Sequence, residues 1–570
     1  MKAWYQMAKR ADFNAIAKRF NISPVLARLI RNRDVVEEKE INKFLNGTLN
    51  DLYDGMLIKD MDKATDVIKE KIENGEKIRI LGDYDSDGVN ATYILLKGIK
   101  GLGGRVDADI PDRVRDGYGL NINLVDKALK DGINTIITCD NGIAAYDEIM
   151  YAKDMGMSVV VTDHHQVPYT EEDGEINYIL PPADAVIDIQ RHDCSYPFKG
   201  ICGASVAYKL IEALYEIMGR DGSDILYLLE NVAIATVTDV MELNNENRIF
   251  VKEGLKRLER TSNLGLRALI ELTNVPAYNI TPYHIGFVLG PCINASGRLE
   301  TAKKALALMK ASTEDEAHKL AEELVELNDI RKDMTEKWVK YAVDEIESSS
   351  MKDDKVMVVY LPECHESIAG IIAGRIREMY YRPTFVLTKG EDSVKGSGRS
   401  IEAYNMFEEM SKCKELFTKF GGHKLAAGLS LKEENVDLFR REINEKCTLT
   451  DNDFVEKIYF DMTLPFEYIT ENLITEFKRL EPCGNGNSRA IFAEKGVKIL
   501  SSRIVGKNKN VVKLRLKDKY GTALDAVYFG DADKFMEDTK YRDSIAVMFY
   551  PDINEFNGYT SVQIVIKDYK

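Results

Sequence analysis

Four apolar segments in the first half of the chain each end in acidic or imidazole side chains. The polar residues that follow them are Asp83, Asp85 and Asp87 after 78–81, Asp140 after 135–138, Asp163, His164 and His165 after 158–161, and Asp239 after 232–237. The two adjacent histidines come from only seven in the whole chain. In an open α/β sheet, functional sites are built at the carboxyl ends of the strands. The pattern therefore predicts that these side chains meet at one edge of a sheet.

This set of side chains indicates a metal site. Carboxylates are hard oxygen ligands, and an added imidazole shifts the preference from Ca²⁺ towards Mn²⁺, with Mg²⁺ as an alternative. Four or five carboxylates around one small cation would repel one another until some became protonated. Two cations avoid this, and two-metal sites stabilise both the attacking and the leaving oxygen of a phosphoryl displacement. Phosphate-ester hydrolysis is the reaction class that we expect.

The turn 83–88 is less informative when it is taken alone. An acidic surface turn, a calcium loop or a helix cap uses the same residue types, and only the other three segments favour a metal site. We expect Asp87 to cap the helix that starts near Val89. Adjacent side chains in an extended segment point in different directions, so only one of the two histidines is easily a ligand.

Hydrophobic periodicity divides the chain into several folded units. At 570 residues the chain is too long for one core, and three or four domains are expected. Over 51–300, short apolar runs alternate with amphipathic segments, which indicates a largely parallel α/β sheet. The predicted units are a helical segment at 1–50, the parallel-sheet domain at 51–300, a connecting helix at 301–350, a smaller α/β domain at 351–450 and a β-rich domain at 451–570.

The β-rich domain carries a basic stripe. Five candidate strands, at 498–505, 511–516, 523–528, 544–550 and 561–566, fit a small barrel such as the oligonucleotide-binding fold. The stripe contains Lys495, Lys498, Arg503, Lys507, Lys509, Lys513, Arg515, Lys517 and Lys519 against one acid, Asp518. The net charge of −16 disfavours a polyanionic partner, but the local charge distribution matters more. Lysines with Tyr520, Tyr528 and Phe529 could bind a single strand, although such aromatics are equally often core residues.

Composition and cysteine usage indicate the cellular compartment. A hydrophobic fraction of 45% is that of an ordinary soluble protein. We find no signal-peptide pattern and no apolar run of membrane-spanning length. Eight cysteines without a Cys-x-x-Cys pair suit a reducing compartment. A non-secreted, cytoplasmic protein without a membrane partner is expected.

Together these motifs resemble those of the DHH phosphoesterase superfamily, and the whole chain resembles its RecJ family of bacterial single-strand-specific 5′→3′ DNA exonucleases. The four defining motifs are Asp83-Tyr-Asp85-Ser-Asp87-Gly, Cys-Asp140-Asn-Gly, Asp163-His164-His165 and the later Asp239. Family-like segments also surround Arg113 and Arg115, Asn294 to Arg298, Gly421 to His423, and Leu480 to Asn487. Cys364 and Cys483 depart from the family, which has tryptophan and phenylalanine at these points.

The resemblance implies the architecture and the roles of individual residues. The implied fold is α/β: a parallel-sheet DHH catalytic domain, joined by a long helix to a smaller α/β DHH-associated domain, and a C-terminal β-barrel of the OB type. The implied ligands of two Mn²⁺ ions, or of Mg²⁺, are Asp83, Asp85, Asp140, His164 and Asp239. Asp163 is expected to orient the site and His165 to face the scissile phosphate. The implied substrate-binding residues are Arg113, Arg298, His365, Ser397, Arg399, Gly421, Gly422 and His423.

The resemblance also implies an activity and partners. The expected enzyme is a single-stranded-DNA exonuclease of DNA repair and recombination that releases 5′-mononucleotides and acts as a monomer, with a helicase and a single-strand-binding protein as partners. Two alternatives stay open. One is a relative that degrades short oligonucleotides or cyclic dinucleotides, and such enzymes generally lack the barrel. The other is a non-catalytic DNA-binding replication scaffold, against which the complete ligand set argues.

Overall fold

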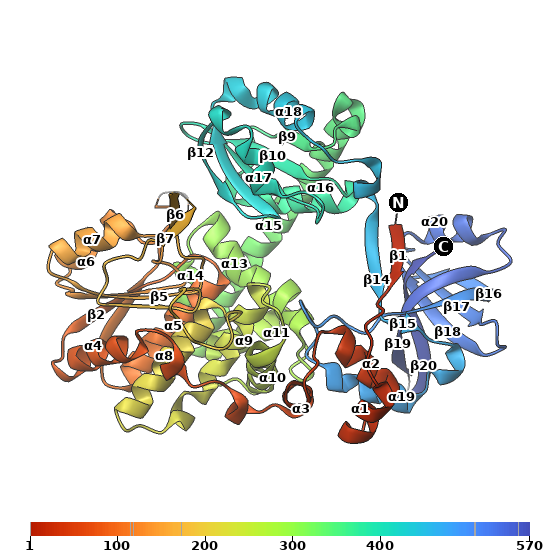
Figure 1. The fold of residues 1–570 in the computed structure, drawn as a ribbon, viewed down its shortest axis with the longest axis horizontal. Coiled ribbons are helices and arrows are strands. Elements are labelled where there is room, and N and C mark those ends of the chain that lie inside the picture. Colours follow the sequence, from red (N-terminus) through yellow and green to blue (C-terminus); the bar gives the residue numbers. More distant parts are fainter. Residues whose placement is uncertain (1, 114–115, 118, 173, 507–508, 557) are drawn as a thin grey trace.

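The computed structural model describes the chain except for residues 1, 114–115, 118, 173, 507–508 and 557. Three lobes succeed one another along the chain (Figure 1). The first contains a five-stranded parallel sheet, the second a five-stranded mixed sheet and the third a six-stranded sheet that closes on itself. The predicted fold class is confirmed.

The first lobe is built on a parallel sheet of order β3-β2-β4-β5-β8. Its strands are β2 (Lys77–Leu81), β3 (Arg105–Asp109), β4 (Thr135–Cys139), β5 (Ser158–Asp163) and β8 (Ala185–Asp188). A hairpin of β6 (Tyr169–Glu172) and β7 (Glu175–Tyr178) follows β5. The strands predicted at 78–81, 135–138 and 158–161 are confirmed as β2, β4 and β5. Since these three are neighbours and parallel, their carboxyl ends share one edge.

Helices cover both faces of this sheet. One face packs against α4 (Met61–Glu73), α5 (Ser86–Gly101), α8 (Gly203–Ile217) and α9 (Leu229–Thr238), and the other against α6 (Ile122–Lys130) and α7 (Tyr146–Asp154). The alternation of strand side chains explains this, because Ile80 faces the first set and Ile136 the second. The apolar segment 232–237 lies in α9, so Asp239 follows a helix and not a strand.

The remaining helices join the first lobe to the second. They are α10 (Asn245–Leu258), α11 (Leu264–Leu272), α12 (Pro282–His284), the π-helical turn η4 (Ile285–Leu289), α13 (Gly290–Leu299), α14 (Lys303–Lys310) and α15 (Glu314–Ser348). The 35-residue α15 contacts α11, α13 and α14 of the first lobe and α16 of the second. The long connecting helix is thus confirmed. Within the described part of the chain, no helix has the length and apolarity needed to cross a membrane.

The second lobe has the sheet order β12-β13-β11-β10-β9. Its strands are β9 (Met357–Tyr360), β10 (Thr384–Lys389), β11 (Val394–Arg399), β12 (Phe417–Gly422) and β13 (Ala426–Leu431). Its helices are α16 (Ala369–Tyr380), α17 (Met406–Ser411) and α18 (Val436–Glu445). Figure 1 places this lobe above the first one, and one cavity is lined by Tyr84 from the loop after β2 and by Ser397 of this lobe. It is therefore in position to cover the predicted site.

The third lobe is a barrel. It contains β15 (Met462–Thr463), β16 (Phe492–Val505), β17 (Val511–Lys517), β18 (Ala523–Phe529), β19 (Ile545–Phe556) and β20 (Tyr559–Tyr569), with helices α19 (Glu471–Phe477) and α20 (Ala532–Thr539). The sheet closes because β16 pairs with both β17 and β19. All five predicted strands are found. Lys507 of the basic stripe lies outside the described residues.

The N-terminal segment is associated with the barrel. It was predicted as helical, and helices α1 (Phe13–Phe20), α2 (Pro24–Asn32) and α3 (Glu38–Asn46) are present, but it begins with a strand, β1 (Lys2–Gln6). Strand β1 pairs in parallel with β14 (Glu456–Phe460), which leads into the barrel. The amphipathic helices bury their apolar faces in the same core as Phe466 and Phe492. The predicted division of the chain at 50, 300, 350 and 450 stays a prediction.

Arg248 of α10 ties the first lobe to this junction. Its buried guanidinium donates to the carbonyl oxygens of Phe44 at 2.9 Å, Leu480 at 2.7 Å and Arg479 at 2.8 Å. It also lies 4.0 Å from the centre of the Phe44 ring. One buried cation thus satisfies carbonyl groups from two distant segments, which fixes the barrel against the first lobe.

Replacing Gly98 with alanine tests the packing of α5 against α8. An alanine Cβ would lie 2.5–2.6 Å from three atoms of the Ile211 side chain, so the helices must separate. We expect Gly98→Ala to lower the free energy of unfolding by about 1–3 kcal/mol in urea titrations followed by circular dichroism. The control is Gly374→Ala in α16, where the added Cβ meets no atom within 4 Å and helix propensity improves. Equal stability of the two variants would contradict the tight α5–α8 contact.

Candidate metal centre and substrate cavity

Three strand ends and one helix end place their acidic side chains together. Asp83 follows β2, Asp140 follows β4 and Asp163 ends β5, while Asp239 caps the carboxyl end of α9. Among the described residues, ligand atoms within 4.8 Å of one another form three groups: Asp83 with Asp85 and Asp140; Asp140 with His164 and His165; and Asp87 with His164 and Asp239. The structure thus brings together all the predicted metal ligands.

The structure assigns the helix cap of the first motif to a different aspartate from the one expected. Asp85, and not Asp87, caps α5, because its Oδ1 accepts from the amides of Asp87 at 2.9 Å and Gly88 at 3.1 Å. Asp87 instead accepts from the amides of Gly203 at 2.7 Å and Ala204 at 2.8 Å, at the start of α8. The expectation that Asp87 caps its own helix is wrong, since the helix begins three residues earlier than predicted. Asp87 joins α5 to α8.

Asp140 occupies a strained position at the centre of the site. Its φ of 61° lies in the left-handed region that residues with a Cβ rarely adopt. The start of α8 presses against it: a Cβ on Gly203 would lie 2.8 Å from both the Cβ and Oδ1 atoms of Asp140. Such strain persists only where the surrounding structure enforces it. The sheet edge and α8 together hold this carboxylate in place.

The two histidines point to different partners. His164 Nε2 lies 3.1 Å from Asp140 Oδ1, 3.6 Å from Asp87 Oδ2 and 3.9 Å from Asp239 Oδ2. Burial lowers the pKa of His164, which favours the neutral imidazole that metals bind. His165 is about half exposed, and its Nδ1 lies 2.7 Å from Asp163 Oδ1. Although burial opposes it, that ion pair raises the pKa of His165 to about 9.

The carboxylates fit a cation site by a test independent of the motifs. Asp83 Oδ1 is buried and, among the described residues, has no hydrogen-bond partner. Burial and the charge of Asp85 raise the pKa of Asp83 to about 8, and burial with Asp87 and Asp85 raises that of Asp239 to about 8. The pKa of Asp140 rises well above its usual value for the same reasons. Because buried carboxylates resist ionisation without positive charge, this donor set fits divalent cations.

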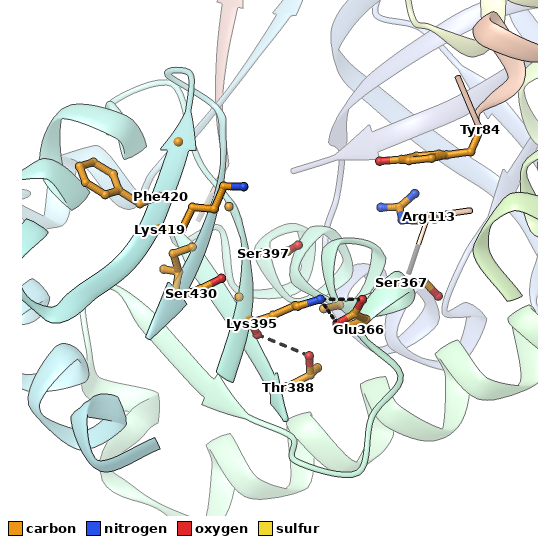
Figure 2. Close-up of a pocket in the computed structure, with 15 residues that line it drawn as sticks. Tyr84, Arg113, Glu366, Ser367, Thr388, Lys395, Ser397, Lys419, Phe420 and Ser430 are labelled. Atoms are coloured by element: carbon orange, nitrogen blue, oxygen red, sulfur yellow. Dashed lines mark hydrogen bonds and ion pairs between the residues drawn. The ribbon is translucent and has the colours of Figure 1, made fainter. Parts of the chain in front are cut away.

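A cavity of about 730 Å³ separates the first lobe from the second. Tyr84 and Arg113 form the wall on the catalytic side, with the guanidinium of Arg113 4.8 Å from the centre of the Tyr84 ring. Figure 2 shows them opposite Ser397, Lys395 and Lys419 of the second lobe. Since Tyr84 lies between Asp83 and Asp85, the cavity adjoins the carboxylates. Arg115, the second arginine of this segment, lies outside the described residues.

The family-like segment 294–298 connects the two walls. Asn294 Oδ1 accepts from the amide of Ser86 at 2.8 Å, which fixes the start of α5. The partly buried Arg298 donates to the carbonyl oxygen of Ser367 in the second lobe at 2.9 Å. Burial and the nearby charge of Arg113 lower the pKa of Arg298 to about 10, so it remains a cation at neutral pH. His365 Nδ1 lies 2.7 Å from Ser367 Oγ, so these groups form one connected network.

The other predicted substrate residues lie on two strands of the second lobe, β11 and β12, and in the turn that follows β12. Ser397 and Gly421 line the cavity. Arg399, on β11 with Ser397, is largely buried, and its Nη1 donates to the carbonyl oxygen of Gly398 at 2.7 Å. Gly422 has a φ of 156°, and a Cβ there would lie 2.5 Å from the carbonyl oxygen of Ala426. His423 is exposed, and its backbone amide bonds to that same oxygen at 2.8 Å, which closes the β12–β13 turn.

Several site residues went unrecognised in the sequence. Asp188 ends β8 beside Asp163, and it is buried with Oδ2 unpartnered among the described residues. Its position after the apolar run Ala185–Ile187 repeats the pattern of the other motifs, so the same rule could have found it. The cavity is also lined by Lys395, Lys419 and Phe420. No sequence pattern marks these residues as functional, because single lysines and aromatics are common on any strand.

Gly203→Ala is expected to displace Asp140 without unfolding the protein. The new Cβ would collide with a backbone-anchored carboxylate and not with a flexible side-chain end. Residues that orient metal ligands typically affect affinity about 10–100-fold, so Mn²⁺ binding measured by calorimetry should weaken by at least about tenfold. Gly222→Ala, with open space at its Cβ, is the matched control. Unchanged Mn²⁺ affinity in Gly203→Ala would exclude this positioning role.

Family models match three parts of the chain in this order: the DHH family N-terminal domain at residues 77–236, the DHHA1 domain at 353–449 and the RecJ OB domain at 460–568. These segments coincide with the parallel-sheet lobe, the second lobe and the barrel. The chain therefore carries the catalytic, associated and oligonucleotide-binding modules of one architecture.

Named relatives share this architecture over nearly the whole chain. The single-stranded-DNA-specific exonuclease RecJ of Bacillus subtilis is 35% identical over 97% of this chain and 69% of its own length, and that of Haemophilus influenzae is 32% identical over 95% of both. The crystal structure of Thermus thermophilus RecJ with Mn²⁺ superposes with a TM-score of 0.83 at 26% identity, covering 100% of this chain and 79% of that one. Its Mg²⁺ complex gives 0.78 at 25% identity, covering 100% and 78%. The chain belongs to the RecJ family of DHH phosphoesterases.

Proposed function

We propose that the chain is a metal-dependent exonuclease that degrades single-stranded DNA from the 5′ end, releases 5′-mononucleotides and serves DNA repair and recombination. The observation that carries the proposal is the arrangement of the site. A cluster of buried carboxylates and one imidazole lies at a sheet edge, directly beside a cavity whose opposite wall belongs to the second lobe. Metal ligands and phosphate-binding groups on two facing walls suit the hydrolysis of a phosphodiester bond held between them.

The residues that would hold two divalent ions are Asp83, Asp85, Asp140, His164 and Asp239. Asp140 belongs to two of the three ligand groups, which suits it to be shared between ions. When bound, Mn²⁺ or Mg²⁺ supplies an activated water and neutralises charge on the attacking and leaving oxygens. Asp163 would orient the site, because it holds His165 and accepts from the amide of Ile143 at 2.9 Å. His165 is half exposed and so is accessible to the scissile phosphate.

The 5′ end of the strand would occupy the cavity between the lobes. Ser397 offers a hydroxyl. Together with burial, the charges of Arg113 and Arg399 lower the pKa of Arg298, and the charge of Arg113 lowers that of Arg399, so the three guanidinium groups lie near one another. Arginine binds phosphate oxygens in pairs, which suits a terminal phosphate. Gly421 and Gly422 would admit the nucleotide backbone, since neither carries a side chain. His365 and His423 would complete the wall, the first through Ser367.

The barrel favours long single strands over the short or cyclic substrates of the alternative. Arg503, Lys513 and Arg515 of the basic stripe line a cleft of about 430 Å³ on β16 and β17. Tyr520 and Phe529 are exposed and suited to stack on bases, whereas Tyr528 packs against Phe535 in the core. The non-catalytic alternative is disfavoured by the complete set of ligands in one cluster.

The cellular setting is part of the proposal. All eight cysteines are free thiols, seven of them buried, which suits a reducing cytoplasm. A helicase and a single-strand-binding protein are proposed as partners from family membership, and the chain is proposed to act as a monomer. A helicase would supply the unpaired strand that the barrel and the cavity need.

Asp140→Asn tests the metal-dependent reaction. The amide keeps the shape of the side chain but removes the charge that two ligand groups share. We expect Mn²⁺-dependent release of mononucleotides from 5′-labelled single-stranded DNA to fall by about 10³-fold or more, since metal coordination provides most of the charge stabilisation. Turnover within tenfold of the wild type would overturn the metal assignment. Asp193→Asn, a surface aspartate paired with Arg191, serves as control.

A second test concerns recognition of the 5′ phosphate. The wild type should bind a 5′-phosphorylated strand more tightly than the 5′-hydroxyl strand, because hydrogen bonds to a charged group contribute about 1.5–3 kcal/mol each. In the Ser397→Ala/Arg399→Ala variant the two strands should bind equally in fluorescence anisotropy without divalent metal. Lys389→Ala, on the neighbouring strand and paired with Glu433, is the matched control. A preference that survives in the double variant would place the phosphate elsewhere.

A further inference from the structure

A second cavity adjoins the metal centre from another side. It has a volume of about 510 Å³ and is lined by Thr238 and Val240, the two neighbours of Asp239, and by Asn294. Asn294 also binds the amide of Ser86, beside Asp85. None of its lining residues belongs to the cavity between the lobes. A strand whose 5′ end occupies the first cavity and whose phosphate lies on the metals would therefore continue into the second.

Val240 in this cavity is strained and exposed. Its φ of 57° puts a β-branched residue in the left-handed region, where the side chain clashes with its own backbone. Its side chain is nevertheless 65% exposed, so no buried packing compensates for the strain. Strain of this kind is concentrated at ligand-binding sites. An apolar side chain held out beside a metal ligand is suited to contact a flat apolar group.

Two exposed aromatics line the same cavity. Tyr283 and Phe287 are 63% and 72% exposed, and their rings stack with centres 5.1 Å apart and planes 27° from parallel. Phe287 lies on the π-helical turn η4, a local irregularity that is frequent at functional sites. A stacked pair of exposed rings offers a free face for a nucleobase, as in other single-strand-binding proteins.

A groove lined by cations, acids and aromatics continues from this cavity to the barrel. A neighbouring hollow of about 690 Å³ shares Pro282 and Tyr283 with it and runs between α10 and the barrel strand β19. Lys252 and Lys256 line one side, away from the acids Glu481, Asp552 and Glu555 of the other side. There the guanidinium of Arg489 pairs with Asp552 at 3.2 Å and lies 3.8 Å from the centre of the Tyr550 ring. Cations interleaved with aromatics are the usual surface for a single-stranded backbone. The groove thus links the metal centre with the barrel.

We propose that Val240, Tyr283 and Phe287 form a base-stacking subsite for the nucleotide immediately 3′ of the scissile phosphate. The inference rests on the proposed function, because it needs a strand held on the metals. The 5′-terminal nucleotide occupies the cavity between the lobes, the next base stacks on the aromatic pair, and the following phosphates pass Lys252 and Lys256 towards the barrel. Stacking on this subsite holds the second nucleotide unpaired while the first is removed.

The test removes one base at a time from the substrate. Three 5′-phosphorylated oligonucleotides are compared: one unmodified, one with a tetrahydrofuran abasic unit at nucleotide 1 and one with it at nucleotide 2. Stacking contributes about 1–3 kcal/mol per base, so the missing base at nucleotide 2 should slow the first cleavage by the wild type about tenfold or more in single-turnover assays. The abasic unit at nucleotide 1 should have a much smaller effect.

Variants connect this effect to the residues. In Tyr283→Ala/Phe287→Ala, the unmodified strand should be cleaved about tenfold more slowly, and the abasic unit at nucleotide 2 should cause no further loss. Phe287→Trp should keep the wild-type response. Tyr278→Ala, which removes a 73% exposed aromatic outside both hollows, is the matched control and should also respond as the wild type. Mn²⁺ binding by the double variant should be unchanged.

Two results would overturn the subsite: an equal response of the wild type and the double variant to the abasic unit, or a loss of Mn²⁺ binding in the double variant. The first would show that the base stacks elsewhere, and the second that the aromatics only support the metal centre. Failure of the proposed function would differ from both, because the wild type would then not cleave the unmodified strand with Mn²⁺.

Discussion

Mutual repulsion among buried carboxylates is the constraint on which the structure depends. Ligand atoms of Asp83, Asp85 and Asp140 lie within 4.8 Å of one another, and Asp239 lies within the same distance of His164 and Asp87. Burial and neighbouring carboxylates raise the pKa values of Asp83, Asp140 and Asp239, and these raised values express the cost. The fold offsets part of that cost with the amide groups at the starts of α5 and α8, which bind Asp85 and Asp87. The remainder calls for divalent cations, as in the Mn²⁺ complex of the Thermus relative.

The strain in the site follows from the same constraint. The carboxylates come from separate strand ends and one helix end, and at two of these ends the backbone adopts an unfavourable conformation. Asp140 and Val240 both have positive φ, and each lies at or beside a proposed metal ligand. Rigid neighbours maintain these conformations: Gly203 of α8 presses on Asp140, and Asn294 holds the loop that carries Asp85. Preorganisation of this kind lets metals bind without rearranging the protein.

The metal centre lies between two hollows of different character, and this difference gives the substrate a direction. The hollow shared with the second lobe carries charged and hydroxyl side chains, of which Arg113 and Ser397 are suited to a terminal phosphate. The one beside Asp239 is largely apolar and continues to the barrel as a groove that carries Lys252 and Lys256 on one side. The buried guanidinium of Arg248 keeps the barrel at the end of that groove, because it extends from α10 of the first lobe and binds carbonyl groups of two segments that pack in the barrel core. The N-terminal helices complete the barrel core, so segments more than 400 residues apart in the sequence act as one unit.

The sequence alone determined the parallel sheet, the connecting helix, the five barrel strands and the clustering of the acids proposed as metal ligands, because periodic apolar runs and the acids that end them are local signals. Only the tertiary structure decided what depends on distant segments. Asp87 binds a helix that starts 116 residues later, β1 pairs with a strand near residue 458, and Tyr283 and Phe287 meet Val240 through the packing of α9 against η4. From the sequence alone, an aromatic residue or an aspartate in a core cannot be distinguished from one on a surface or in a functional site. Only its neighbours in space distinguish these cases.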